Sequence, residues 1–403
     1  MSIKTSPPSK VIADIAIVGA GLVGLAAAVA LHQAGFSVVL VDSKNPSKTD
    51  FSEDAWDARI YAISPKNVDW LRYLGVWPRM NQKRIGQMQA MEIFADDEKS
   101  PLKLSASDVN AEDLGAIVES KALMQALLTQ VNTLAIQTLF DASCEKVVSA
   151  PQNVKLLLSN QIAIDSQLLL AADSSQSWVR KQVNFPVQKK SYEQTAIVAN
   201  FRVEKPHGNI ARQWFSSDLE GKNSILAWLP LPDNMISIVW SVSTKQADSL
   251  LKLSGCDFTE RVKEAGGNLL GGFKLQGSLA AFPLNLQKTN NLVQDCVVLI
   301  GDAAHQVHPM AGQGVNLGFR DVVDLVEILK NKHAFQSLND ANLLRQYVRI
   351  RKADNFKMML LTDGLYQLFE SQNRVVKLAR RWGFSQTKHQ AVKKLLVANA
   401  VAL

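Results

Sequence analysis

Hydrophobic positions near the N-terminus follow one another in a strand–helix–strand order. Residues 12–18 form a short, β-branched apolar run that ends at Gly19, so the pattern predicts a buried strand. A helix rich in small residues continues through residues 26–31, and Gly35 ends it. Residues 37–41 then predict the next strand. This order is typical of the βα unit that begins a parallel sheet.

A second apolar strand followed by a helix is predicted close to residue 300. Residues 297–300 are apolar and lead into Gly301 and Asp302. Residues 311–330 then predict a helix, because its apolar residues recur mostly at the helical period: Val315, Leu317, Phe319, Val322, Val323, Leu325, Val326 and Leu329. A second strand end and helix N-terminus are therefore expected to approach one ligand, with a helix dipole suited to negative charge.

Between residues 183 and 283 the pattern changes to alternating strands. The stretches TAIVANFRV, SILAWLPLP and MISIVWSVS show the change most clearly. Such alternation predicts an antiparallel sheet with one face turned to a ligand cavity. Four aromatic residues supply apolar bulk, and each is expected in a core rather than in a cavity wall: Trp214, Trp228, Trp240 and Phe282.

The first turn carries a phosphate-binding fingerprint. Residues 19–24 read G-A-G-L-V-G, which matches G-x-G-x-x-G, with its glycines at Gly19, Gly21 and Gly24. A pyrophosphate must meet bare backbone N–H groups at a helix N-terminus, and a side chain on Gly21 would block it. Asp42 follows the second strand, 18 residues beyond Gly24, where a carboxylate accepts hydrogen bonds from a ribose. These features predict a dinucleotide site and do not separate NAD from FAD.

Composition narrows the class of protein. The 403 residues are 47% apolar, enough for two packed lobes. The three cysteines (Cys144, Cys256 and Cys296) lack CxxC spacing and indicate neither a zinc site nor a disulfide framework. Lys4 and Lys10 precede an apolar run that superficially resembles a signal peptide, but glycines interrupt it, so a cytoplasmic protein is expected.

The net charge of +7 is concentrated at the C-terminus. Residues 371–403 contain seven Lys and Arg and no Asp or Glu, whereas residues 1–370 contain 37 basic and 37 acidic residues. This distribution argues against nucleic-acid binding by the body of the protein. The basic segment is either a solvated amphipathic helix packed on the body or a contact for anionic lipid headgroups or a membrane-bound partner; the membrane contact is favoured.

Six motifs spread over nearly the whole chain carry a family resemblance. They are GAGLVG at Gly19, DARIYAIS at Asp57, LGVW at Leu74, IVES at Ile117, GDAAHQVHPMAGQGVNLGF at Gly301 and RKADNFKM at Arg351. With these motifs the chain resembles the UbiH/UbiF/UbiI (VisC-like) family of FAD-dependent aromatic hydroxylases in ubiquinone biosynthesis, which are group A flavoprotein monooxygenases.

The resemblance implies a fold and a division of the chain. The fold is α/β with antiparallel β: a Rossmann-like FAD-binding lobe of the para-hydroxybenzoate hydroxylase type, an inserted β-sheet substrate domain and C-terminal helices. The expected FAD-binding domain comprises residues 11–80, 110–181 and 285–345, the substrate domain 81–109 and 183–283, and the basic helical segment 346–403.

The resemblance also implies an activity. NAD(P)H reduces FAD, O₂ forms a flavin C4a-hydroperoxide, and this species hydroxylates the ring of a polyprenylated phenol or quinol. The stretches EKPHGNIARQWF and ISIVWSVS favour ring position 5, whereas RKADNFKM favours position 6. No catalytic base is identified. Enzymes of this kind meet their substrate at the membrane, so peripheral binding to the inner membrane, or to a ubiquinone-biosynthesis protein complex, remains open.

The family places several residues at the cofactor. Asp302 would bind the ribityl chain of FAD, Arg59 would approach the cofactor, and Pro309 would shape the turn that faces the ring. The helix start would lie against the isoalloxazine through Gly312, Gln313, Gly314, Val315 and Asn316.

Some residues allow a plainer interpretation. Arg59 could form a surface ion pair, and Lys121 could meet a phosphate or remain solvated. His305 and His308 have a spacing that metal ligands or bases also show. No acid or cysteine in the sequence nearby completes a metal set, so packing or hydrogen-bonding roles are expected for both.

One segment departs from the family pattern. Where the family has G-A-D-G-x-x-S-x-x-R, this chain keeps Asp173, Ser177 and Arg180 but has Ala171 and Ser174 in place of the two glycines. If the second position lies at positive φ, Ser174 adds strain of about 1 kcal/mol. The departure motivates an alternative, a catalytically silent FAD-binding scaffold subunit of a quinone-synthesis assembly. A further alternative is an FAD-dependent prenyl-chain reductase.

Overall fold

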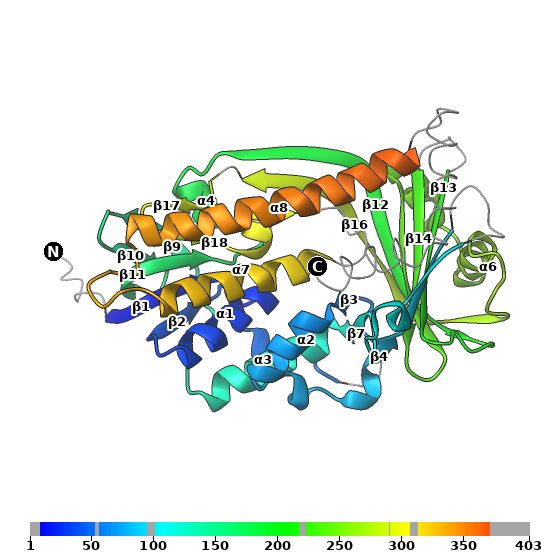
Figure 1. Ribbon diagram of the computed structural model, residues 1–403, viewed down its shortest axis with the longest axis horizontal. Coiled ribbons are helices and arrows are strands. Elements are labelled where there is room, and N and C mark those ends of the chain that lie inside the picture. Colours follow the sequence, from blue (N-terminus) through cyan, green and yellow to red (C-terminus); the bar gives the residue numbers. More distant parts are fainter. Residues whose placement is uncertain are drawn as a thin grey trace, which may run out of the picture.

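The computed structural model describes residues 9–52, 56–94, 101–217, 223–289, 291–306 and 313–370. Figure 1 shows two lobes side by side, one built around β1, β2 and α1 and the other around β12–β16, with the long helix α8 running along both. The strands in these ranges form three sheets. A mainly parallel sheet in one lobe and an antiparallel sheet in the other confirm the predicted fold class.

The first lobe is built on the mainly parallel sheet. Its strands run in the order β17 (Val293–Gln294), β18 (Val297–Leu299), β11 (Ala163–Ala171), β1 (Lys10–Val18), β2 (Val38–Val41) and β8 (Gln137–Leu139). Two further strands, β10 (Val154–Leu158) and β9 (Cys144–Ser149), add antiparallel to β11. Val18 lies beside both Ala171 and Val41. The loops that follow β1, β2 and β11 therefore leave from one edge of the sheet.

Strand β1 differs from its prediction at its first residues. It starts at Lys10, and Ile12 is 72% exposed, so the buried part of the strand begins at Ala13. The first residues of β1 pair only with β11, because pairing with β2 begins at Ile15. Apolar character alone predicted burial there, but β2 does not extend far enough to cover that end.

The second lobe is built on a long antiparallel sheet. Its strands run in the order β19 (His305–Gln306), β16 (Phe273–Thr289), β12 (Val187–Val203), β15 (Met235–Ser243), β14 (Asn223–Leu231), β13 (Ile210–Ser217), β5 (Ala90–Phe94) and β6 (Leu102–Ser105). β12 and β16 each have 17 residues and pair from Val187–Thr289 to Val203–Phe273, with two irregularities. The boundary expected between residues 283 and 285 therefore falls inside β16, because the ladder continues through it.

Each face of this sheet has a different role. One face packs under α5 (Thr244–Leu250) and α6 (Gly255–Ala265) and buries Trp214, Trp228 and Trp240, as predicted for these three residues. Phe282 differs: it is 39% exposed and lies on the other face, where it lines a cavity. The residues of one strand alternate between the two faces, which explains why aromatic residues of one sheet have different environments.

A small sheet and several helices connect the lobes. The sheet has the order β3 (Ile60–Ile63), β7 (Gly115–Glu119) and β4 (Gly86–Met88). Helices α1 (Leu22–Gln33), α2 (Pro65–Tyr73) and α3 (Ser120–Thr133) pack around it and the parallel sheet, and the short α4 (Trp178–Gln182) follows β11. Single 3₁₀ turns occur at Pro46–Lys48, Trp77–Arg79, Gln82–Arg84, Ala106–Val109 and Gly301–Ala303. Strand β4 thus pairs within the small sheet rather than within the substrate sheet.

Two long helices follow β18. Helix α7 (Gln313–Lys330) packs on α1, and α8 (Ala341–Glu370) packs on α7. α8 begins before residue 346, so the C-terminal helical segment is continuous with the preceding lobe (Figure 1). Among the described helices, none combines the length and the apolar character that crossing a bilayer requires.

Candidate functional site

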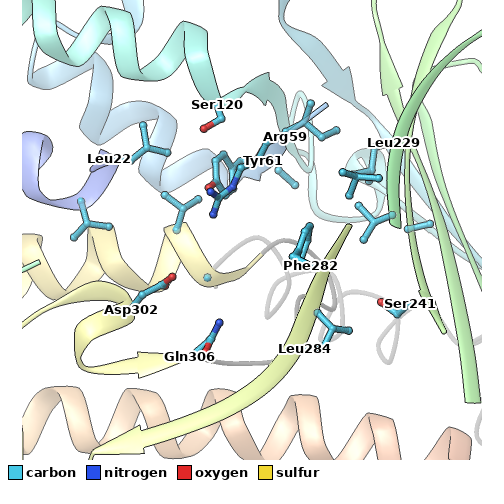
Figure 2. A pocket seen from close by; sticks show the side chains of 18 of the residues that line it. Leu22, Arg59, Tyr61, Ser120, Leu229, Ser241, Phe282, Leu284, Asp302 and Gln306 are labelled. Atoms are coloured by element: carbon cyan, nitrogen blue, oxygen red, sulfur yellow. The ribbon is translucent and has the colours of Figure 1, made fainter. Parts of the chain in front are cut away.

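One cavity of about 410 Å³ opens between the two lobes. Gly21, Arg59, Asp302 and Gly314 line its side toward the parallel sheet, and Figure 2 shows Arg59, Tyr61 and Ser120 on one wall with Asp302 and Gln306 opposite. Phe282, Leu284, Leu229 and Ser241 line its side toward the antiparallel sheet. The two predicted turns and the predicted face of the β-sheet therefore border one space.

The glycines of the first turn are required for two different physical reasons. Gly19 has φ +108°, and a Cβ there would overlap the carbonyl of Ala172. A Cβ at Gly24 would overlap the carbonyl oxygen of Gly19. A Cβ at Gly21 would meet no protein atom within 4 Å, and Gly21 borders the cavity. Two glycines thus allow close packing, whereas the third leaves open space at the start of α1, which no side chain caps.

Asp42 supports the first turn directly. Its Oδ2 accepts a hydrogen bond from the Ala20 N–H at 2.7 Å, and its Oδ1 accepts one from the Lys44 N–H at 2.8 Å. The residue follows β2, as the fingerprint predicts, but it is not among the residues that border the cavity. Each carboxylate oxygen keeps further lone-pair capacity for a ribose hydroxyl.

Two acidic side chains, Asp57 and Glu119, accept hydrogen bonds from the backbone of the loop that carries Arg59. The Arg59 N–H donates to Oδ1 of Asp57, and the Asp57 N–H donates to Oε1 of Glu119. Glu119 is 4% exposed and accepts two hydrogen bonds from Arg84, at 2.7 and 2.8 Å. The Arg84 guanidinium lies 4.1 Å from the ring centroid of Trp56. This chain of contacts fixes the backbone of Arg59 at the cavity wall.

Within the described chain, Arg59 forms no ion pair with an acid, so the surface ion pair is not observed. Its guanidinium lies 5.6 Å from the ring centroid of Tyr61 and projects toward the cavity (Figure 2). Lys121 is exposed, and its N–H donates to Oδ2 of Asp57, so its backbone also supports this loop. Burial raises the pKa of the Tyr61 hydroxyl above its usual value.

Asp302 faces Arg59 across the cavity. Solvent reaches its side chain through the opening, yet protein surrounds it on the other sides. Burial raises the pKa of the Asp302 carboxyl, and nearby His305 and Arg59 lower it in part. A carboxylate that is partly desolvated without a ligand is suited to accept hydrogen bonds from the hydroxyls of one.

A buried charge cluster holds the turn that carries Asp302. The Gly301 N–H donates to Oδ2 of Asp321 at 2.8 Å, and Nε2 of His305 lies 2.7 Å from the same oxygen. Arg351 is 1% exposed and contacts Asp321 at 2.6 Å, Asp324 at 2.9 Å and Asp354 at 2.7 Å. Burial alone would raise the pKa of Asp321, but His305 and Arg351 lower it below its usual value. The carboxylate is therefore charged and paired.

His305 therefore has the hydrogen-bonding role that the sequence predicts, and the acid that completes its environment is Asp321. His308 lies outside the described residues, as do Pro309 and Gly312. Gln313 is the first residue of α7, and its side chain is not described. Gly314 and Val315 line the cavity, and a Cβ at Gly314 would meet open space.

Asn316 lies on a different side of α7 from the cavity. It is 1% exposed, its Oδ1 accepts hydrogen bonds from the Ser64 N–H and from Nδ2 of Asn67, and its Nδ2 donates to the carbonyl of Ala62. Asn316 therefore joins the start of α7 to β3 and α2. Its position suits a residue that fixes this helix start; a contact between its side chain and the flavin stays a prediction.

The segment that departs from the family pattern lies between the two turns. Ser174 has φ +72° and lines the cavity, so the conditional expectation of a strained serine is met. Ser177 caps α4 by accepting the Arg180 N–H. Arg180 is 2% exposed and donates to the carbonyls of Ala303 and Ser175, at 2.7 Å each. The retained serine thus caps α4, and the retained arginine binds this segment to the turn of Asp302.

The sequence did not reveal the role of Asp321, Arg351, Glu119 or Asn316 as supports of the cavity. Asp321 and Asn316 lie in a helix predicted from its apolar residues, and Arg351 was noted only within a motif. The sequence offered one signal for such supporting residues: a charged or amide residue at a helix position that is expected to face the interior.

The described residues fit FAD. An uncapped helix N-terminus with open space at Gly21 suits a diphosphate, Asp302 suits hydroxyls of the ribityl chain, and the start of α7 at Gly314 leaves room for a flat ring system.

Comparisons with known proteins agree with this geometry. The FAD binding domain family matches residues 12–359. Ubiquinone hydroxylase UbiL of Rhodospirillum rubrum is 33% identical over 398 residues, which cover 97% of this chain and 90% of that protein. The 3-demethoxyubiquinol 3-hydroxylase of Escherichia coli is 31% identical over 384 residues, 94% of this chain and 96% of that protein.

A solved structure shows the same fold. The p-nitrophenol 4-monooxygenase PnpA of Pseudomonas putida superposes with a TM-score of 0.75 at 16% identity, covering 98% of both chains. The resemblance predicted from the motifs is confirmed, and the chain belongs to the FAD-binding domain family.

Proposed function

We propose that this protein is an FAD-dependent monooxygenase that hydroxylates the aromatic ring of a polyprenylated phenol or quinol in ubiquinone biosynthesis. One observation carries the proposal: a single cavity joins the uncapped start of α1 and the start of α7 to the apolar face of the antiparallel sheet. The names of the two relatives, a ubiquinone hydroxylase and a demethoxyubiquinol hydroxylase, support the substrate class.

The residues around FAD have distinct tasks in this proposal. Gly21 and the start of α1 hold the diphosphate, Asp302 holds the ribityl hydroxyls, and Arg59 approaches the cofactor from the opposite wall. When bound, FAD would supply the activation of O₂, with NAD(P)H as the proposed reductant. Backbone N–H groups at the start of α7, beside Gly314 and Val315, stabilise negative charge on the ring system.

The sheet side of the cavity holds the substrate. Ile225, Leu229, Val239, Phe282 and Leu284 form an apolar wall, which binds an aromatic ring and excludes water from the reacting atoms. The sequence favours oxidation at ring position 5 over position 6. The name of the Escherichia coli relative shows that one such enzyme acts on a demethoxyubiquinol. Complementation of strains deficient in each hydroxylation step distinguishes the positions.

The reaction is tested with purified protein, FAD, a short-chain prenylated phenol and ¹⁸O₂. The proposal predicts NAD(P)H oxidation that depends on the phenol and yields product with one ¹⁸O atom; parallel reactions with NADH and NADPH identify the reductant. A protein that binds FAD but forms no product would be the scaffold subunit that the strained Ser174 motivates. Reduction of the prenyl chain without ¹⁸O would identify the reductase.

The proposal extends to the membrane surface. Residues 371–403, with seven cations and no acid, lie outside the described residues, and their charge suits anionic headgroups of a cytoplasmic membrane face or a membrane-bound complex. Deletion of residues 385–403 should weaken sedimentation with vesicles that contain anionic phosphatidylglycerol. Unchanged sedimentation would contradict a lipid contact by this segment.

A further inference from the structure

We propose that Gln213 and Ser241 recognise oxygen atoms on the ring of the substrate and thereby select oxygenated aromatic rings over plain ones. This inference rests on the proposed function, because it assigns the substrate side of the same cavity. Gln213 lies on β13 and Ser241 on β15, and both line the cavity.

Strand alternation places both side chains on the cavity face. On β15, Ser241 shares its face with Val239, whereas Trp240 and Val242 belong to the core under α5 and α6. On β13, Gln213 shares its face with Ala211, whereas Trp214 packs in the opposite core. Figure 2 shows the Ser241 hydroxyl oxygen on the side of that residue toward Phe282.

The surroundings of the two side chains are apolar. Ser241 pairs across the sheet with Ile225, and Gln213 pairs with Ala227 and Ile93. Arg212, beside Gln213, is held by Glu92 at 2.9 Å and by the carbonyl of His207 at 3.2 Å. Charged groups on this part of the wall are therefore already paired.

Neither Gln213 nor Ser241 forms a side-chain hydrogen bond with another residue that the structure describes, and both side chains border the cavity. A hydroxyl and an amide without a partner in an apolar wall favour a ligand that supplies the matching oxygen or hydroxyl, and they disfavour a ligand that lacks it. Ser241 can donate to or accept from a ring oxygen, and the Gln213 amide can do the same.

The space between the two residues suits a flat ring. On β14, which lies between β13 and β15, the position next to Gln213 is the small residue Ala227. Ala227 and Val239 form one row across the sheet, and Val198 of β12 continues it. Short side chains in this row leave room, while Phe282 and Leu229 line the cavity beside it (Figure 2).

Paired ligands test the inference. FAD-loaded protein is titrated with 2-geranylphenol and with geranylbenzene, which lacks the ring hydroxyl, and the dissociation constants are measured by tryptophan fluorescence. Wild type should bind the phenol at least about tenfold more tightly, and Ser241→Ala and Gln213→Met should each reduce this ratio several-fold. The ¹⁸O₂ reaction with each variant should show a higher KM for the phenol.

Ser237→Ala is the matched control. Ser237 lies on the same strand and face as Ser241, is fully buried without a hydrogen-bond partner in the described structure, and does not line the cavity. This variant should keep the ligand preference of wild type. A preference that is absent in wild type, or unchanged in both test variants, would overturn the inference. Wild type that prefers the phenol but forms no ¹⁸O product would overturn the proposed function and leave the recognition site standing.

Discussion

The two turns that border the cavity carry out similar tasks by different means. Each places a helix N-terminus at a strand end: α1 after β1, and α7 after β18 and the residues that follow it. The first turn depends on close backbone packing, with Gly19 against Ala172 and Gly24 against Gly19. The second depends on side chains from other elements, because Asp321 and Arg351 hold Gly301, and Asn316 joins α7 to β3.

The difference lies in how many contacts each residue serves. In the first turn, Gly19 and Gly24 each face one backbone carbonyl, of Ala172 and of Gly19, so a substitution there disturbs one contact. In the second turn the charge cluster joins Arg351 to Asp321 across 30 residues, and Asn316 separately joins α7 to Ser64 across 252. A substitution in the second turn therefore changes the packing of several elements together. We expect substitutions in the second turn to lower the stability of the FAD-free protein more than those in the first turn. Substitutions in the first turn should have the larger effect on FAD affinity.

The largest effect is expected for Arg351→Met. This change leaves Asp321 fully buried and without its guanidinium partner, which costs about 3–5 kcal/mol of unfolding free energy. Urea unfolding and FAD retention on gel filtration measure it. Arg349→Met is the control, since Arg349 is an exposed cation on the same helix. Equal stability of the two variants would show that the cluster does not support the second turn.

The paired variants Gly24→Ala and Gly21→Ala separate packing from binding in the first turn. A Cβ at Gly24 overlaps the Gly19 carbonyl, so this variant should lose about 1–3 kcal/mol of stability without FAD. A Cβ at Gly21 meets no protein atom within 4 Å, so this variant should unfold like wild type yet bind FAD at least about tenfold more weakly. Full FAD affinity in Gly21→Ala would remove the diphosphate from this turn.

Asp302→Asn tests the charge of the second turn. Because burial raises the folded-state pKa of Asp302, its ionisation disfavours folding, and stability falls as the pH rises through that pKa. The variant should therefore melt at a higher temperature than wild type at pH 7 without FAD, and this gain should disappear at acidic pH. FAD affinity should fall about tenfold.

An exposed aspartate provides the control for that experiment. Asp248→Asn, on the outer helix α5, should change neither the melting temperature nor FAD binding. A lower melting temperature of Asp302→Asn at pH 7, together with unchanged FAD affinity, would show that the carboxylate serves the fold instead of the cofactor.

The smallest effect is expected for Ser174→Gly. Glycine adopts φ +72° without strain, so this variant should gain up to about 1 kcal/mol, offset in part by the flexibility of glycine in the unfolded chain. Ser175→Gly, at a neighbouring residue outside the left-handed region, should instead lose stability. Thermal unfolding of both variants compares them, and a destabilised Ser174→Gly would mean that the serine side chain contributes a contact.

Prediction from the sequence succeeded where periodicity or sterics acts over short distances. β15 coincides with the stretch MISIVWSVS, and residues 26–31 lie within α1. The boundary predicted near residue 285 falls inside β16, because β12 continues to pair with β16 through Thr289. Phe282 was expected in a core because aromatic character does not reveal which face of a sheet is covered.

By itself the sequence determined the glycine-rich turn after β1, the class of fold and the family, because these depend on residue types at fixed spacing along the chain. Only the tertiary structure decided that Asp321, Arg351, Glu119 and Asn316 support the cavity and that Gln213 and Ser241 face it without partners. The physical reason is that a buried charge or amide is stable only beside a partner, and folding brings that partner from a distant part of the chain.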